Sequence, residues 1–244
     1  MPLCPTLWAG VRMPLWELWL PLACAASAVG WTTLAARRTG SGGLHFVARG
    51  LLGGAAAFGL ASIGFDLIEI VGLDVTWERI ARGGVEGAAL AVAVGVVEEG
   101  AKLAGLLLVV APGLRTRAVL AAAAGVAAGF AALEAVVTLG PAAGSAAGAA
   151  RVAFAPIAHG LLAAPLTLGL AATLRGEGRP LRPVISGFLA SALLHADANL
   201  SITLPSLLGT AGFALALLAP ALLVHALARR AERWAPPRTS VARG

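Results

Sequence analysis

The sequence has few charged residues and no tyrosine. Only 12% of its 244 residues are Asp, Glu, Lys or Arg, whereas a typical soluble domain has about 25%. Hydrophobic residues make up 59%, and the mean hydropathy is +0.87. This composition excludes a soluble globular enzyme, a disordered chain and a nucleic-acid-binding domain, because too little polar surface remains to face water.

Cysteine is equally scarce. Cys4 and Cys24 are the only two, and they form no C-x-x-C pair, so the sequence carries neither a disulfide framework nor a cysteine zinc site. The zinc-protease motif H-E-x-x-H is also absent. Ser191 lies one helical turn from His195, but no third group completes a catalytic triad there.

Long apolar runs dominate the sequence. Each is long enough to cross about 30 Å of hydrocarbon at about 1.5 Å per residue. We therefore predict an all-α, polytopic transmembrane helical bundle of about seven spans, over residues 16–35, 47–70, 84–110, 118–139, 151–174, 183–203 and 206–228. Gly and Ala occur throughout, and the spacing of Gly125 and Gly129 favours close helix–helix contact.

Arginine positions predict the direction of these spans. The segments after spans one, three and five and the C-terminal tail together hold thirteen arginines, and the other side holds four. The positive-inside rule then places the N-terminus outside and the C-terminus in the cytoplasm of a multi-pass plasma-membrane protein. The basic excess thus predicts contact with the lipid bilayer and not with nucleic acid.

We expect a single transmembrane domain over residues 1–228, with its polar motifs in 84–203, followed by a basic cytoplasmic tail over 229–244. The charged segment 74–82 predicts a short interfacial helix on the outer face. The small residues 23–28 resemble a signal-peptide cleavage region, but Arg37 and Arg38 favour a first span that is retained.

Ionisable residues inside the predicted spans are the strongest functional signal. A carboxylate at the bilayer centre costs at least about 2.5–3.5 kcal/mol, so such residues face a bundle interior, a cavity or a reaction site. Several polar residues lie about 18–24 Å from the cytoplasmic ends of their spans, in one layer of the outer half. They are Glu98 in span three, Glu134 in span four, His159 in span five, and His195 and Asn199 in span six.

Helical spacing orders these groups further. His195 and Asn199 share one helix face, and Glu98 and Lys102 share another in the orientation that favours an ion pair. Glu98 and Glu99 are adjacent and cannot point the same way. One of the two glutamates therefore faces the cavity, and the other turns toward Lys102 or a neighbouring helix.

Peptide-bond hydrolysis uses such groups in two ways. In the first, a carboxylate is the general base for a water molecule, while histidine and asparagine position the water and stabilise the oxyanion. In the second, a glutamate and two histidines hold a catalytic zinc ion, and another glutamate is the base. The sequence leaves both mechanisms open.

Four short motifs occur in order on successive spans: Glu98-Glu99-x-x-Lys102, Phe130-x-x-x-Glu134, His159 and His195-x-x-x-Asn199. Together they resemble the PrsW family of intramembrane proteases and, more distantly, the CAAX prenyl protease and bacteriocin-processing superfamily. The resemblance implies hydrolysis of a membrane-anchored protein, such as a single-span anti-sigma factor, on its extracytoplasmic side. Ala135 departs from the family pattern, in which Asn often follows the second-motif glutamate.

The resemblance also implies roles for these residues. Glu98 or Glu99 would be the base, the two histidines would hold water or metal, and Asn199 would bind the scissile carbonyl. The implied catalytic residues are Glu98, Glu99, Glu134, His159, His195 and Asn199, with Lys102, Phe130 and Asp197 in support. If zinc is the cofactor, its ligands come from Glu98, Glu99, His159 and His195.

Two other classes of function stay open. Intramembrane Glu, Lys and His residues also build proton-coupled transporters, although the polar residues of spans three to six have no counterpart in spans one and two, as an inverted repeat would require. A catalytically inactive scaffold could bind single-span partners through its Gly- and Ala-rich faces. Replacing Glu98 or Glu99 by Gln distinguishes the protease, the transporter and the scaffold. A protease would lose cleavage but still bind its partner, a transporter would lose pH-dependent flux, and a scaffold would bind its partner as before.

Overall fold

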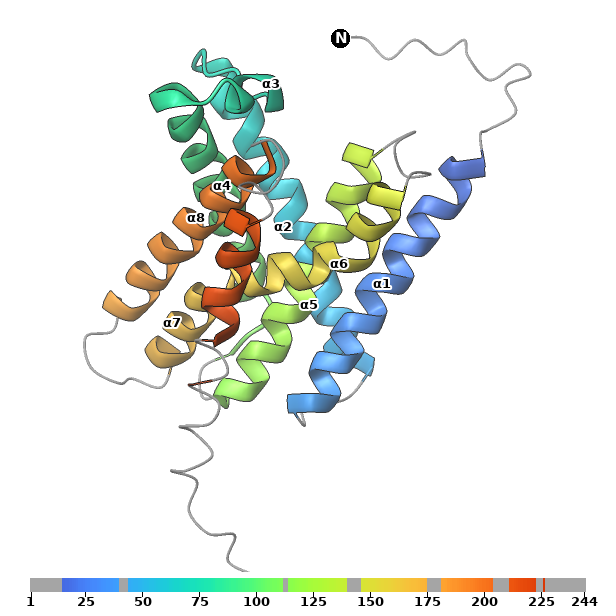
Figure 1. Ribbon diagram of the computed structural model, residues 1–244. Coiled ribbons are helices and arrows are strands. Elements are labelled where there is room, and N and C mark those ends of the chain that lie inside the picture. The colour runs from blue at the N-terminus through green and yellow to red at the C-terminus, as the bar shows by residue number, and fades with distance from the viewer. Residues whose placement is uncertain are drawn as a thin grey trace, which may run out of the picture.

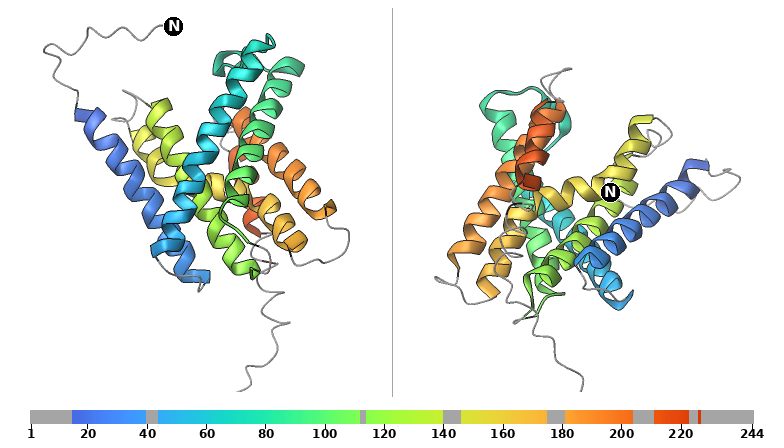
Figure 2. Two further views of the ribbon diagram at one scale, coloured as in Figure 1. Left: turned by 180° about the vertical axis from the view of Figure 1, so that it is seen from behind. Right: turned by 60° about the horizontal axis from the view of Figure 1, so that its bottom comes forward.

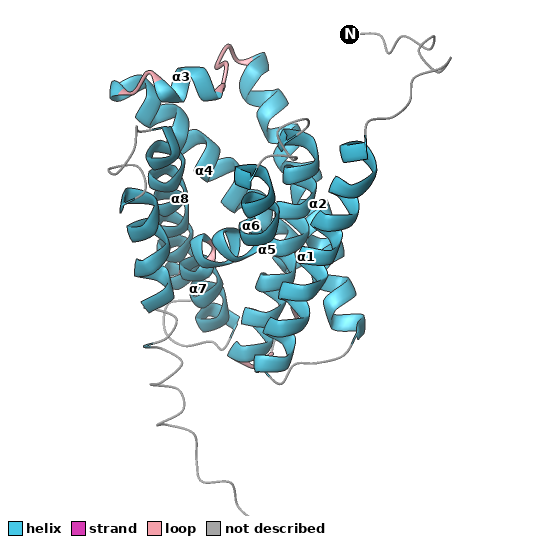
Figure 3. Cartoon of the chain, turned by 45° about the vertical axis from the view of Figure 1, so that its right-hand side comes forward, coloured by secondary structure: helices cyan, strands magenta, loops and turns pink. Residues whose placement is uncertain are grey.

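The computed structural model describes residues 15–39, 44–111, 114–139, 146–174, 181–203, 211–222 and 226. Within these residues the chain is helical, with short turns and no strand (Figure 1, Figure 3). The helices are α1 (Leu15–Thr39), α2 (Leu44–Ile70), α3 (Trp77–Ala81), α4 (Gly84–Leu107), α5 (Thr116–Leu139), α6 (Ala146–Leu162), α7 (Ala164–Leu174) and α8 (Arg182–Thr203), followed by an apolar helix at Ala211–Leu222. The prediction of an all-α fold is confirmed.

Each predicted span overlaps a described helix, the seventh of them at Ala211–Leu222, but the number of spans is not confirmed. Among the described residues, three helical segments are long and apolar enough to cross a membrane, namely Trp19–Arg38, Val47–Ile70 and Thr116–Leu139, and α6 with α7 makes a fourth if the bent pair crosses as one. The 24 residues of α4 and the 22 of α8 would suffice in length, but both helices carry the polar motifs, which lower their hydropathy. Seven spans and their direction therefore stay predictions, and the tail over 229–244 lies outside the described residues.

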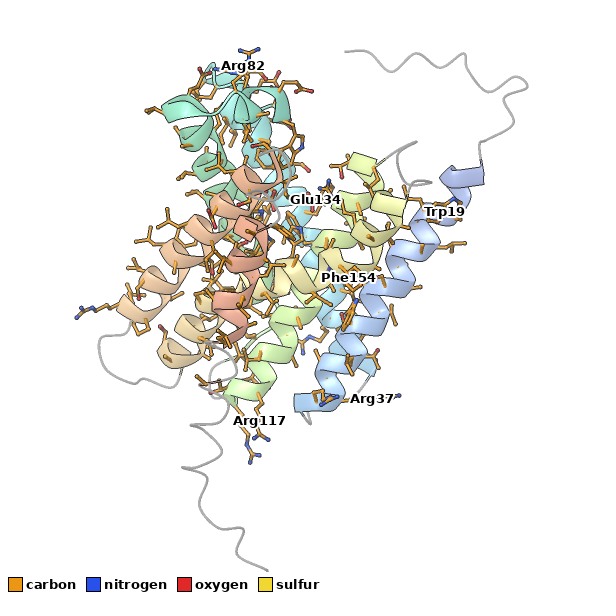
Figure 4. All side chains as sticks on the ribbon, viewed as in Figure 1. Trp19, Arg37, Arg82, Arg117, Glu134 and Phe154 are labelled. Atoms are coloured by element: carbon orange, nitrogen blue, oxygen red, sulfur yellow. The ribbon has the colours of Figure 1, made fainter. Side chains whose placement is uncertain are left out.

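The two ends of the bundle carry different groups of arginines. Figure 4 shows Arg37 and Arg117 at one end and Arg82 at the other, which is the grouping that the arginine count predicts. The predicted interfacial helix corresponds to α3, beside Arg82. Its first turn is capped by Thr76, whose Oγ1 accepts a hydrogen bond from the backbone N–H of Arg79 (3.4 Å).

Helix α5 is the centre of the bundle. It packs against α1, α2, α4, α6 and α7 (Figure 2). In lipid there is no hydrophobic driving force for apolar helices to associate, so close van der Waals packing between small residues holds them together. A Cβ added to Gly125 would lie 2.9 Å from Cα of Gly50, and one added to Gly129 would meet the backbone of Leu51. The close contact predicted from the glycine spacing is thus confirmed, and its partner is α2.

Replacing Gly54 by Ala is expected to weaken this contact between α2 and α5. A Cβ at Gly54 would lie 2.7 Å from the backbone nitrogen of Phe130 and 2.8 Å from Cα of Gly129, so the helices must move apart, at a cost of about 1–3 kcal/mol. Gly59→Ala is the matched control, because no atom of the described residues lies within 4 Å of a Cβ at that position. Thermal unfolding in detergent compares the two, and equal midpoints would contradict the tight contact.

The predicted fifth span is not one continuous helix. α6 and α7 meet at a bend of 46° around Ala163. Pro165 favours the break, because it has no N–H to donate and its ring disfavours helical backbone at Ala164. The backbone N–H of Leu166 donates to Oγ of Ser191 on α8 at 3.0 Å. The neighbouring helix therefore stabilises the bend, which lies one turn beyond the histidine of α6.

Candidate active site and metal site

Four helices bring most of the predicted catalytic residues into contact inside the bundle. Figure 4 shows Glu134 between the end that carries Arg82 and the end that carries Arg117. The side chains that meet there are Glu98 and Glu99 from α4, Glu134 from α5, His159 from α6 and His195 from α8. The contacts show that Glu98, Glu134, His159 and His195 meet, as their positions in the sequence predict, and their common depth in the membrane stays a prediction.

Glu98, His159 and His195 form a compact set of potential metal ligands. One ligand atom from each lies within 4.8 Å of the other two. Oε2 of Glu98 lies 3.3 Å from Nε2 of His195 and 3.9 Å from Nδ1 of His159. A tetrahedral zinc ion with bonds of about 2.0–2.1 Å holds its ligand atoms roughly 3.3 Å apart. Small side-chain movements would therefore close this set around an ion.

A carboxylate holds the second nitrogen of each histidine. Nδ1 of His195 lies 2.9 Å from Oε1 of Glu99, and Nε2 of His159 lies 2.8 Å from Oε2 of Glu134. Metal-ligating histidines usually donate their other ring N–H in this way, which fixes the tautomer and directs the free nitrogen to the metal. Nδ1 of His159 is buried and has no hydrogen-bond partner among the described residues. The donor set and this unpaired nitrogen fit a divalent ion such as zinc.

Lys102 lies closer to Glu99 than to Glu98. Its Nζ is 2.8 Å from Oε1 of Glu99 and 3.5 Å from Oε2 of Glu98, whereas helical spacing favoured Glu98 as its partner. Nζ also lies 4.6 Å from the ring centroid of Phe130, and that ring lies 5.5 Å from the ring of His159. Lys102 and Phe130 thus border the site from the side of α4 and α5, and their supporting role stays a prediction.

Arg151 also belongs to the site, although the sequence analysis counted it only among the arginines that set topology. Its Nη2 lies 3.3 Å from Oε1 of Glu134. The sequence feature that could have identified Arg151 is its position on α6, about two helical turns before His159. With it, the site has two chains of a cation, a carboxylate and a histidine. These chains are Lys102–Glu99–His195 and Arg151–Glu134–His159, which we call the lysine chain and the arginine chain.

A cavity of about 580 Å³ opens beside the histidines. Its walls are mostly apolar, and they include Phe154 of α6 and Phe213 and Leu217 of the helix at Ala211–Leu222. Its polar lining consists of Glu134, Arg151, His159, His195 and Asn199. A second cavity, of about 460 Å³, is lined by Glu98, Phe130 and Glu134 among others. Glu134 and Trp77 line both cavities, so the site is reached from two sides.

Asn199 and Asp197 take different places on α8. Asn199 is buried, lines the larger cavity together with His195, and leaves its Nδ2 without a hydrogen-bond partner among the described residues. An unpaired amide donor at the edge of a cavity can bind a carbonyl oxygen. Asp197 is exposed and does not line either of these two cavities. The structure therefore brings Asn199 to the site and leaves Asp197 outside it.

Glu99 does not belong to the metal-ligand set. It is fully buried, and its Oε1 is engaged by Lys102 and by Nδ1 of His195. Of the four residues named as candidate zinc ligands, the structure thus groups Glu98, His159 and His195. The two adjacent glutamates have different partners. Glu98 lies near both His159 and His195, whereas Glu99 contacts Lys102 and His195.

Comparison with known proteins agrees with this geometry. Neither the search of curated proteins nor the search of solved structures gave a match. The family model described as PrsW family intramembrane metalloprotease matches residues 42–225, which is well over half of the chain and includes every residue of the site. The chain therefore belongs to the PrsW family of intramembrane metalloproteases.

Proposed function

We propose that the protein is an endopeptidase that hydrolyses a peptide bond of a membrane-anchored protein with a metal ion held by Glu98, His159 and His195. The observation that supports this most is the convergence of Nδ1 of His159 and Nε2 of His195 on Oε2 of Glu98, with the other nitrogen of each histidine held by a carboxylate. Two histidines and one glutamate are a known ligand set of catalytic zinc. When bound there, a divalent ion would supply Lewis-acid chemistry and would lower the pKa of a water molecule toward neutral pH.

Glu134 is the residue to which we assign proton transfer. Its side chain is 16% exposed and lines both cavities, whereas those of Glu98 and Glu99 are 8% and 0% exposed. Oε2 of Glu134 contacts His159 at 2.8 Å, and Oε1 contacts Arg151 at the longer distance of 3.3 Å. We therefore assign to Oε1 the proton that leaves the attacking water and passes to the leaving amine. Glu99 takes no proton in this proposal, and it orients His195 instead.

Asn199 is assigned to the carbonyl oxygen of the substrate. Asn199 lines the same cavity as the histidines, and its buried Nδ2 has no hydrogen-bond partner among the described residues. A donor that is already in place when negative charge develops on this oxygen stabilises the transition state. The amide therefore binds the oxyanion, as the resemblance to the family implies.

The substrate that we propose is a single-span membrane protein, with an anti-sigma factor as the first candidate. The apolar walls of the larger cavity suit the side chains of a membrane-spanning segment. The location that we propose is the plasma membrane, with cleavage near the extracytoplasmic side. This side follows from the arginine count, which places α3 and the nearby motifs toward the outside.

Cleavage of tagged single-span proteins by purified protein in liposomes tests the proposal. We expect wild type to cut at least one substrate, and we expect His195→Ala to leave the same substrate bound but intact. Leu193→Ala is the matched control, because Leu193 is on the same helix, two residues away, with a side chain that is 58% exposed. Equal cleavage by wild type and His195→Ala would exclude this site from the reaction.

A further inference from the structure

We propose that Arg151 is a positioning residue, which keeps Glu134 against His159 and so keeps Nδ1 of His159 directed at Glu98. This inference rests on the proposed function, because it concerns the same metal site. It goes beyond the sequence motifs, which do not include Arg151, and it explains how one half of the site is held in place.

The contacts of Glu134 carry the argument. Oε1 of Glu134 lies 3.3 Å from Nη2 of Arg151, and Oε2 lies 2.8 Å from Nε2 of His159. The two oxygens are thus held from opposite directions, and rotation of the carboxylate would break both contacts together. If Glu134 turned away, nothing that the structure describes would hold Nε2 of His159, and the imidazole could rotate away from Glu98.

The lysine chain and the arginine chain differ in how they are held. In the lysine chain, the side chains of Lys102 and Glu99 are 3% and 0% exposed, so the surrounding helices fix them. In the arginine chain, the side chain of Arg151 is 40% exposed at the lining of the larger cavity. The side chain of Glu134 is itself 16% exposed, so packing holds it less firmly than Glu99, and the ion pair with Arg151 adds a restraint that packing does not supply.

Because Arg151 is partly exposed, its effect on the reaction can be measured apart from any effect on stability. The pair of Arg151 and Glu134 is partly exposed, with side chains 40% and 16% exposed, whereas those of Lys102 and Glu99 are 3% and 0% exposed. Its loss should therefore cost much less stability than loss of the buried pair. The carboxylate that orients a metal-binding histidine has a large effect on function, because loss of such a partner typically lowers metal affinity or activity roughly 10–100-fold. Loss of Arg151 should thus change the reaction and the affinity for metal, and should change unfolding little.

The test compares Arg151→Leu with Arg151→Lys in the full-length protein. We expect Arg151→Leu to lower kcat roughly tenfold or more and to weaken zinc affinity several-fold, measured by competition with a chelator of known affinity. KM and the thermal midpoint should change little. Arg151→Lys should recover most of kcat, because it restores a cation near Glu134. Arg79→Leu is the matched control, because Arg79 forms another exposed Arg–Glu pair, with Glu86, and does not line the two cavities.

A double variant ties the effect to Glu134. In a Glu134→Gln background, Arg151→Leu should weaken zinc affinity no further, because both changes act on one contact. Additive losses would overturn the inference, and so would wild-type kcat and zinc affinity in Arg151→Leu. Failure of wild type to cleave any substrate would count against the proposed function instead, and zinc affinity would still decide the role of Arg151.

Discussion

Glu98→Gln is expected to abolish both zinc binding and cleavage. The amide has nearly the shape of the carboxylate but lacks the negative charge that a divalent ion requires of this ligand set. Cleavage should fall at least about 10³-fold, the scale on which enzymes lose rate when an essential catalytic group is removed. Stability should change little, because the contact of Glu98 with Lys102 is the longer of the two that Lys102 makes with the glutamates. Equilibrium dialysis against zinc and the cleavage assay measure the two effects.

Glu86→Gln is the control for this experiment. Glu86 is on the same helix as Glu98, but it is exposed and pairs with Arg79 far from the histidines. Its replacement should leave zinc binding and cleavage at wild-type levels. If Glu98→Gln bound zinc with wild-type affinity, Glu98 would not be a ligand. If it also cleaved normally, the proposed site would be wrong.

Lys102→Met is expected to have the largest effect on stability. Glu99 is fully buried, and Lys102 is the cation that contacts it, at 2.8 Å. Removal of one partner of a buried ion pair leaves an uncompensated charge and typically costs about 3–5 kcal/mol. The free energy of unfolding in detergent should fall by that amount, and cleavage should fall with it, because Glu99 then loses the partner that keeps it against His195.

A second substitution should separate stability from activity. In the double variant Lys102→Met and Glu99→Leu, the carboxylate closest to Lys102 is gone together with the lysine, and only the longer contact of Lys102 with Glu98 (3.5 Å) is lost without compensation, so most of the lost stability should return. Cleavage should stay low, because Nδ1 of His195 has lost the carboxylate that orients it. A double variant that is as unstable as Lys102→Met would contradict the assignment of Lys102 as the counter-ion of Glu99.

The meeting of Glu98, Glu134, His159 and His195 was predictable from the sequence. The cost of placing a charge in lipid leaves few positions for such residues, and a fixed rise per residue converts their sequence positions into depths. Ionisable residues at one depth on successive apolar helices avoid lipid by facing the bundle interior, and there they come close together. The same reasoning placed α3 at the end of the bundle, where a charged segment follows an apolar helix.

Other features depend on how neighbouring helices rotate and pack, which periodicity does not determine. Lys102 prefers Glu99 over Glu98 because the α4 backbone turns Glu99 toward Lys102 and His195. In the sequence, Arg151 has the position of an arginine at the end of a membrane span, and its contact with Glu134 follows only from the packing of α6 against α5. Pro165 favours the bend at Ala163, but the contact that stabilises it comes from Ser191 of another helix, whose hydroxyl accepts the N–H of Leu166. Each of these contacts joins residues whose relation is visible only in three dimensions.

The zinc K-edge X-ray absorption spectrum of purified, cleavage-competent protein tests the central claim most directly. We predict one zinc per chain with nitrogen and oxygen ligands at about 2.0–2.1 Å, the scattering pattern of two imidazoles, and no sulfur at about 2.3 Å. The imidazole signal should weaken in His159→Ala, and the zinc should be lost in Glu98→Gln. Full cleavage activity in protein that contains no metal, or a zinc shell without imidazole, would contradict the assignment of Glu98, His159 and His195 as the metal site.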